Sequence, residues 1–433
     1  MNKIKLLNKK ALTKISDLKV RFNDENSFFG PALIFMVGSV SVSVLSWLYQ
    51  LLMGRMLGPN EYGILGALFA LVYIATYATT AFNLSVSKFS AEFHGKEKIG
   101  EFKYLIRKSL MFVSVVGIIC FIIYLFLIPY IANFLKIEDY FGIMIVGLIA
   151  LLSIISAVLT GALNGSHKFV WQNVSSFCSA LVKVGLAVIL VYLGYSVGGA
   201  LIGVFVGLII GILISLYPFV VSFKNVKIQK FDSSKIPFYF MFVFLSSILP
   251  ILIITFDQLL VKHYFSSTDA GFYVAAGMIA KIIWFGSGFL VSPLFPKVVS
   301  LHAKGKDTSR LLFKAILYTG FLISVGCAAY YVMPTFLVST LFGSTYLPVV
   351  PLIGLFGVAM GLFSLIQIMI TYNLALERKG FIPILIVGLI IELIGILLFH
   401  KSLEEIVKIV FATNCFIIIS MIFYNRKELF KLN

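Results

Sequence analysis

The residues most able to do chemistry in this sequence are charged side chains in the middle of long apolar stretches. Lys183, Lys281 and Glu392 each occupy such a position. At about 1.5 Å of helix rise per residue, they fall near the midplane of a bilayer. A charge at that depth is costly, so it lines a pathway for a ligand or pairs with another charge. Lys183 and Lys281 are therefore candidate binding residues for an anionic ligand.

Other candidate residues lie nearer the ends of these stretches. Pro250 removes a backbone hydrogen bond and is expected to kink its helix, which carries Asp257 a short distance further on. An acid on a kinked helix is a candidate gate, and Asp257 and Glu392 are the candidates for coupling to an ion gradient. Arg55 closes the first stretch, and its planar guanidinium suits a phosphate held by two hydrogen bonds. Each of these charges has a plainer alternative, an ion pair or hydrogen bond between helices with no ligand contact.

The elements that carry these residues follow from composition. Of the 433 residues, 60% are hydrophobic and 12% are charged, whereas soluble domains have about 45–50% and about 25%. This composition excludes a soluble globular enzyme. Apolar runs of about 17–25 residues, the length of a transmembrane helix, recur without the two-residue alternation of a barrel strand. We therefore expect an all-α integral membrane protein with twelve transmembrane helices, at residues 30–54, 63–83, 109–134, 140–163, 170–192, 197–221, 236–261, 271–295, 311–337, 348–373, 380–399 and 404–424.

The basic residues indicate how the chain is oriented in the membrane. Most of the 35 Lys and Arg residues lie in the N-terminal tail and in alternate connections, whereas few lie in the connections between them. Because cytoplasmic connections carry the excess of Lys and Arg, we expect a multi-pass protein of the cell membrane with both termini cytoplasmic. The net charge of +17 then reflects topology and attraction to anionic membrane lipids. A nucleic-acid partner is not expected, since its site would need these cations on one folded face.

Two segments of the chain are repeated at an offset of about 208 to 210 residues. Residues 56–67 and 264–275 both place a large apolar residue, small or polar residues, an acid, a spacer and a glycine before a new helix. The connections at 88–96 and 297–306 also match. The repeat predicts two six-helix lobes, at 30–221 and 236–424. A cytoplasmic linker at 222–235 joins them, and cytoplasmic tails at 1–29 and 425–433 flank them.

An even number of spans per lobe makes the repeat parallel. Such lobes can enclose a cavity and rock against each other, which is a mechanism of transport. Lys183 and Glu392 occupy equivalent positions in the two lobes. We therefore expect these opposite charges to face each other across the cavity.

Several segments resemble the polysaccharide transporter family, which contains the O-antigen flippases of the multidrug/oligosaccharidyl-lipid/polysaccharide (MOP) superfamily. They are GRMLGPNEYG at 54–63, Asp257 with DAGFYVAA at 269–276, and PLFP at 293–296. The resemblance implies a V-shaped, two-lobed bundle that flips a polyprenyl-(pyro)phosphate-linked oligosaccharide to the outer leaflet for cell-surface polysaccharide synthesis. Lys183, Lys281 and Arg55 would then attract the head group, while the lipid tail stays beside the lobes. Glycan-assembly enzymes would be further partners.

Two other functions fit parts of the pattern. A cation-coupled multidrug exporter of the same superfamily is the main alternative, disfavoured because basic residues at the midplane repel cationic drugs. A membrane-bound sugar polymerase would need a large external loop, which the short connections do not provide. With no phosphate-binding glycine loop and no pair of His at metal spacing, we expect neither an enzyme nor a bound cofactor or metal. The energy would come from an ion gradient or from downstream consumption of the flipped lipid.

Overall fold

The computed structural model describes residues 29–224, 226–230, 236–291 and 294–429. Residues 1–28 of the predicted N-terminal tail, residues 225 and 231–235 of the predicted linker at 222–235, and residues 430–433 of the predicted C-terminal tail lie outside this range, as does Pro293. Within it, the chain forms helices joined by short connections. They are α2 (Phe29–Ala78), α3 (Thr80–Gly95), α4 (Ile99–Leu135), α5 (Tyr140–Gly165), α6 (Phe169–Tyr192), α7 (Ser196–Ser222), α8 (Ile236–Ile253), α9 (Phe256–Tyr264), α10 (Ser267–Val291), α11 (Leu294–Ala303), α12 (Ser309–Val332), α13 (Pro334–Leu341), the 3-10 helix η1 (Ser344–Val349), α14 (Val350–Ala375), α15 (Phe381–Leu398), α16 (Leu403–Tyr424) and α17 (Arg426–Leu429).

The expected number of membrane spans is confirmed. Among the described residues, 11 helical segments are long and apolar enough to cross a membrane. The first of them contains a kink at Gly58, where φ is 71° and ψ is 173°. A positive φ favours glycine, and Pro59 follows it at the first position of the next helical segment, where proline is tolerated. The kink separates the first two spans, which gives twelve.

Two spans end differently from the prediction. The seventh is interrupted, because α8 ends at Ile253 and α9 begins at Phe256. Helix α8 passes through Pro250, so the break follows the proline by several residues instead of lying at it. The ninth span ends at Val332 instead of 337, because Pro334 begins the separate short helix α13.

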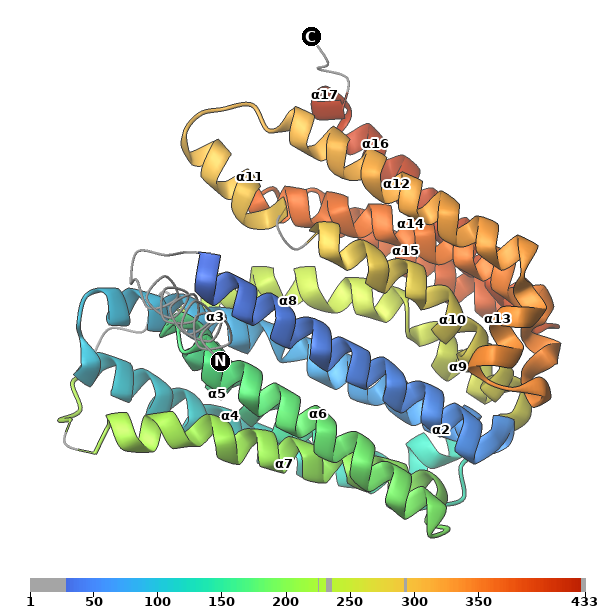
Figure 1. Ribbon diagram of the computed structural model, residues 1–433, viewed down its shortest axis with the longest axis horizontal. Coiled ribbons are helices and arrows are strands. Elements are labelled where there is room, and N and C mark those ends of the chain that lie inside the picture. The colour runs from blue at the N-terminus through green and yellow to red at the C-terminus, as the bar shows by residue number, and fades with distance from the viewer. Residues whose placement is uncertain (1–28, 225, 231–235, 292–293, 430–433) are drawn as a thin grey trace, which may run out of the picture.

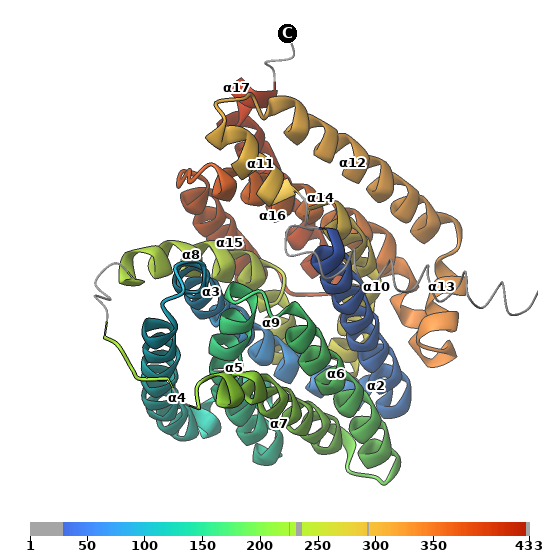
Figure 2. The ribbon, with the colours of Figure 1, turned by 60° about the vertical axis from the view of Figure 1, so that its left-hand side comes forward.

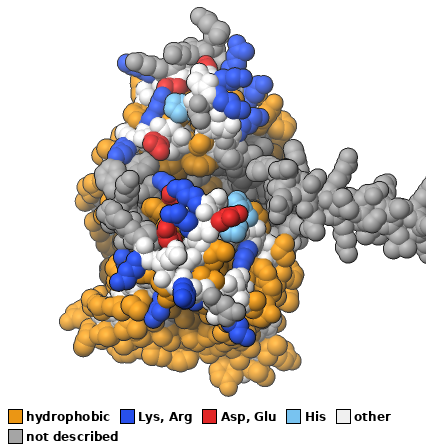
Figure 3. Space-filling view, turned by 90° about the vertical axis from the view of Figure 1, so that its left-hand side faces the viewer, with side chains coloured by type: hydrophobic (Ala, Val, Ile, Leu, Met, Phe, Trp, Pro, Cys, Tyr) orange, Lys and Arg blue, Asp and Glu red, His pale blue; other side chains and the backbone are white. Residues whose placement is uncertain are grey.

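The helices form an elongated bundle with two distinct ends (Figures 1 and 2). The basic end, at the left of Figure 1, carries the connections at 96–98, 166–168, 223–224, 226–230, 304–308 and 376–380. Lys and Arg side chains gather on this face, and hydrophobic side chains cover the flanks around it (Figure 3). The opposite end carries the connections at 136–139, 193–195 and 399–402, together with α13. Toward the basic end, α11, α12, α14 and α16 lean away from α3 to α7, which gives the V shape.

Helices on the outside of the bundle expose apolar side chains. Phe112 and Ile123 on α4 and Phe321 and Val325 on α12 are more than half exposed. Such a surface is costly in water but suits the hydrocarbon core of a bilayer. The interior is packed mainly from α2, α5, α10, α14 and α16. The protein is therefore a multi-pass membrane protein.

The two halves of the chain touch where α2 crosses α10. A Cβ atom on Gly63 would overlap the backbone of Ser267 and Gly271, and a Cβ atom on Gly271 would overlap the carbonyl of Pro59. Pro59 and Ser267 are equivalent positions in the repeat, as are Gly63 and Gly271. The contact is therefore reciprocal, as expected at an axis that relates two parallel repeats.

Glycines also allow close packing within each half. Gly199, Gly203 and Gly207 on α7 lie directly against α6, where Cβ atoms would overlap Leu190, Ala187 and the carbonyl of Ser179. On α14, Gly357 and Gly361 lie against α12 in the same way. Small residues let helix backbones approach closely in membranes. Through this packing α7 supports α6, the helix that carries Lys183.

The crossing predicts an effect on stability. Gly271→Ala should destabilise the protein by about 1–3 kcal/mol, the usual range for overpacking, because its Cβ would meet the backbone of Pro59, which cannot rotate away. Thermal unfolding of the purified protein in detergent, followed by tryptophan fluorescence, measures this. Gly286→Ala is the matched control, since it lies on the same helix with open space around it. Equal unfolding temperatures for the two variants would show that the crossing is not tight.

Candidate functional site

A cavity lies between the two halves of the chain. It has about 90 Å³ of free volume and is lined by α2 from the first half and by α8, α9 and α10 from the second. The position between related halves is where transporters with internal repeats hold their substrates. The cavity is therefore the candidate binding site.

Aromatic and polar side chains make up most of the first-half wall. Gln50 donates a hydrogen bond from Nε2 to the Tyr73 hydroxyl at 3.0 Å, and the Tyr62 hydroxyl donates to Gln50 Oε1 at 3.5 Å. Phe69 and Tyr77 extend this wall, and Trp284 and Phe285 of α10 face it from the second half. Tyr and Trp combine an apolar face with a polar tip. The wall can therefore contact a ligand through both hydrogen bonds and ring faces.

Lys281 is the charged residue on the cavity wall. Its Nζ donates a hydrogen bond at 3.1 Å to the carbonyl of Ile254, which lies at the break between α8 and α9. A helix break leaves backbone carbonyls without their usual partners, so the break supplies an acceptor for the ammonium group. Lys281 is 9% exposed, and its ammonium group also interacts electrostatically with Asp257.

Asp257 lies behind Lys281 in the first turn of α9. The Tyr273 hydroxyl donates to its Oδ2 at 2.6 Å, and the backbone N–H of Gln258 donates to its Oδ1 at 2.8 Å. Asp257 also interacts electrostatically with Glu392 of α15. Glu392 is 0% exposed, and neither of its carboxylate oxygens has a hydrogen-bond partner among the described residues. The structure thus brings together three predicted site residues, Asp257, Lys281 and Glu392.

Lys183 lies outside this group. Its Nζ donates to the Ser46 hydroxyl at 3.0 Å and lies 5.2 Å from the ring centre of Tyr49, as in a cation–π contact. Tyr49 packs against Phe69, with ring centres 5.6 Å apart, and Phe69 lines the cavity. Lys183 is therefore one layer of side chains behind the cavity wall.

The prediction that Lys183 and Glu392 face each other across the cavity is wrong. Lys183 contacts Tyr49 on its own half, and Glu392 interacts with Asp257 on its own half. Tyr49 and Asp257 are themselves equivalent in the repeat. Each half therefore pairs the same two positions, although the residues at those positions differ. Equivalent residues of a two-fold repeat face each other only when they lie on its axis, and these do not.

Arg55 and Pro250 do not line the cavity. The guanidinium of Arg55 donates from Nε to the carbonyl of Leu341 at 2.7 Å and from Nη2 to the carbonyl of Thr340. It is thus bound to the end of α13. The phosphate-binding role expected of Arg55 and the gating role expected of Pro250 stay predictions.

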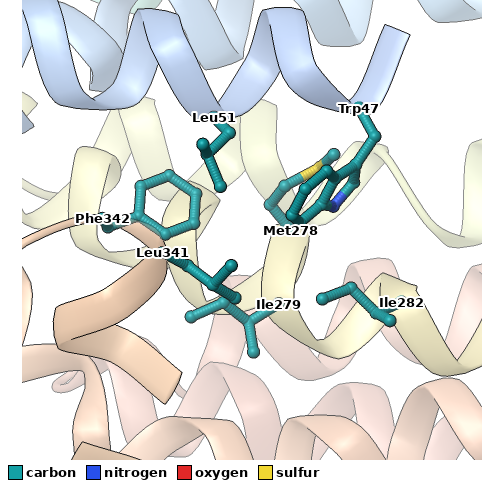
Figure 4. Close-up of a pocket in the computed structure, with 7 residues that line it drawn as sticks. All are labelled: Trp47, Leu51, Met278, Ile279, Ile282, Leu341 and Phe342. Atoms are coloured by element: carbon teal, nitrogen blue, oxygen red, sulfur yellow. The ribbon is translucent and has the colours of Figure 1, made fainter. Parts of the chain in front are cut away.

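A second, smaller pocket lies beside the main cavity (Figure 4). It is a shallow recess without room for a water molecule, and it is lined by apolar side chains, among them Trp47 and Leu51 of α2, Ile282 of α10 and Leu341. Met278 contributes to both pockets. An apolar pocket therefore adjoins the polar one across a single side chain.

Some site residues carried no sequence signal that marked them out. Tyr273 is the partner of Asp257, but it lies in the repeated helix start that was interpreted as a structural motif. Gln50 and Tyr73 lie among many other polar and aromatic residues of the spans. Thr255 could have indicated the break between α8 and α9, since the hydroxyl of a threonine between apolar residues competes for backbone hydrogen bonds. The described residues contain no group of three or more His, Cys, Asp or Glu side chains that could hold a metal ion.

The fold is similar to that of known transporters at low sequence identity. An inward-facing multidrug resistance MATE family transporter of the MOP superfamily matches with a TM-score of 0.71 and 14% identity, covering 88% of this chain and 94% of that one. The lipid II flippase MurJ, in an inward closed conformation, matches with a TM-score of 0.69 and 13% identity, covering 92% and 89%. An outward-facing MATE family transporter has a TM-score of 0.65 and 15% identity, covering 92% and 95%. These matches confirm the expected fold class, that of the MOP superfamily.

The comparison with curated proteins gave no match. The model of one protein family, described as polysaccharide biosynthesis protein, matches residues 31–302. The match includes the kink at Gly58, the crossing glycines, the helix break and Lys281, and it covers more than half of the chain. The chain therefore belongs to the family of polysaccharide biosynthesis proteins, as its resemblance to polysaccharide transporters predicted.

Proposed function

We propose that this protein is a flippase that moves a polyprenyl-(pyro)phosphate-linked oligosaccharide across the cell membrane by alternating access. The observation that carries the proposal is the cavity between the halves, with the ammonium of Lys281 on its wall. Family membership supports a role in polysaccharide synthesis. The similarity in fold to MurJ, a flippase of lipid II, supports an amphipathic lipid as cargo.

In this proposal the basic end is cytoplasmic and the cavity loads from that side. The excess of Lys and Arg at this end supports the orientation. The crossing of α2 and α10 holds the two halves in close contact near the opposite end, which supports loading from the basic end. Rocking of the halves about this crossing would then open the opposite end.

The two adjoining pockets suit the two parts of such a lipid. The (pyro)phosphate would replace the Ile254 carbonyl and Asp257 as the partner of Lys281, since a charge-assisted hydrogen bond is stronger than a neutral one. The first sugars would lie along Gln50 and the tyrosines. The polyprenyl chain would leave past Met278, over the apolar side chains beside it, toward the lipid. Lys183 would add positive charge from behind the wall.

The pair of buried carboxylates suits coupling to an ion gradient. Once an anion draws Lys281 away, Asp257 and Glu392 would remain together without a counter-charge, which is costly in a buried site. Binding a proton or a monovalent cation between them would remove that cost. Binding of the head group and binding of the ion would then favour each other. Glycan-assembly enzymes on the outer surface would consume the product and help to drive the cycle forward.

A multidrug exporter remains the second candidate, because aromatic rings are numerous on the cavity wall. Tyr62, Phe69, Tyr73 and Trp284 could surround an organic cation through cation–π contacts. The ammonium of Lys281 in the same cavity opposes this. Efflux of a fluorescent cationic drug from cells, with no flipping of a lipid-linked oligosaccharide, would favour the exporter.

The central role of Lys281 can be tested in proteoliposomes with a labelled polyprenyl-pyrophosphate oligosaccharide. Lys281→Gln should slow flipping by about tenfold or more, the effect of losing one hydrogen bond to a charged group. Lys183→Gln should have a smaller effect, because Lys183 lies behind the wall. Lys314→Gln, at an exposed lysine of α12, is the control. Equal rates for Lys281→Gln and Lys314→Gln would remove Lys281 from the site.

Ion coupling predicts a separate effect of Glu392→Gln. This variant keeps the shape of the side chain but removes the charge and the exchangeable proton. Flipping should still equilibrate the lipid, but imposed proton or sodium gradients should no longer accelerate it. The measurement compares flipping rates with and without each gradient, and Glu404→Gln, at an exposed acid of α16, serves as control. A variant that still responds fully to a gradient would place the coupling elsewhere.

A further inference from the structure

At the opposite end, basic residues of each half of the chain bind the end of a helix that belongs to the other half. Arg55, at the end of the first span, donates to the carbonyls of Thr340 and Leu341 at the end of α13. Lys262, near the end of α9, donates from Nζ to the carbonyl of Leu135 at the end of α4 at 2.7 Å. Each contact joins residues from different halves of the chain.

His263 strengthens the second contact. Its Nδ1 lies 2.7 Å from the carbonyl of Phe134, and because a carbonyl only accepts, the ring donates. The same ring stacks on Phe134, with ring centres 4.3 Å apart. In the first contact, Phe342 packs against Gly54, and the Tyr346 hydroxyl donates to the Gly54 carbonyl at 2.7 Å.

The two contacts are equivalent in the repeat. Arg55 and His263 occupy matching positions, and so do Phe342 and Phe134. In each case a basic residue at the end of one half's first span binds the carbonyl end of a helix from the other half. The last carbonyls of a helix lack internal partners and carry a partial negative charge, so a cation there is favourable.

These contacts depend on closure of the opposite end. Arg55 and Lys262 can reach α13 and α4 only while the halves lie together there, beside the crossing of Gly63 and Gly271. Opening this end would separate both cations from their carbonyls at once. We propose that Arg55 on one side, and Lys262 with His263 on the other, form a paired latch that holds the opposite end closed.

The latch can be tested in nanodiscs by measuring spin-label distances, without substrate. The four native cysteines are first replaced by alanine. Labels at Tyr195→Cys and Lys401→Cys, exposed positions of different halves, report separation at the opposite end. Arg55→Gln should increase the ratio of long to short distances by about tenfold, since a charge-assisted hydrogen bond is lost. Adding Lys262→Gln and His263→Gln to this variant should increase the ratio of long to short distances further.

Three comparisons make the outcome decisive. Lys408→Gln removes an exposed cation that pairs with Glu404 on its own helix, and it should change nothing. Arg55→Lys should keep most of the molecules at the short distance, because an ammonium group already binds helix carbonyls in this way at Lys262. Labels at Tyr195→Cys and Glu138→Cys lie within the first half and should keep their separation.

Two results would overturn the proposal. The triple variant and Lys408→Gln could give the same distance distribution, in which case the contacts do not control closure. Alternatively, the distance within the first half could change as much as the distance between halves, in which case these residues stabilise the fold. Neither result bears on the nature of the substrate, so the latch and the flippase proposal can fail separately.

Discussion

The arrangement of the whole molecule depends on a backbone contact between the two halves. At Gly63 and Gly271 there is no room for a side chain, and each helix meets the other's backbone directly. A contact of this kind is small and fixes the distance between the halves while leaving the angle between them adjustable. The open and closed states would then differ mainly in the angle between the two halves at this contact. The cavity lies on one side of the crossing, and the cation contacts with α13 and α4 lie on the other.

The repeat keeps the positions of the site but changes their chemistry. Asp257, Lys281 and Glu392 in the second half correspond to Tyr49, Tyr73 and Lys183 in the first. In the second half they form a group of ionisable side chains, and in the first half a lysine lies over an aromatic ring. The first half thus contributes a neutral, aromatic wall to the cavity and keeps one cation behind it. The proposed ion-dependent steps therefore involve residues of the second half.

Much of this could be predicted from the sequence because lipid imposes simple rules. Length and apolarity alone located the spans, and a spaced pair of helix starts revealed the repeat. The partners of individual charged side chains were harder to predict, because the apolar pattern of a helix does not determine how the helix is rotated about its axis. Lys281 and Asp257 were singled out separately, but their interaction depends on the break after Ile253. Arg55 was expected at a phosphate, since nothing in the sequence shows that α13 folds back beneath it.

The ammonium of Lys281 has one more consequence, which concerns voltage. A fixed charge near the midplane feels the electric field of the membrane, and the field redistributes when water enters the cavity from the other side. Carrying one elementary charge through 100 mV involves about 2.3 kcal/mol. Even a fraction of that is enough to shift a balance between two conformations several-fold. Because Asp257 lies beside Lys281, the membrane potential acts on this pair mainly through any change in the separation of the two opposite charges along the membrane normal.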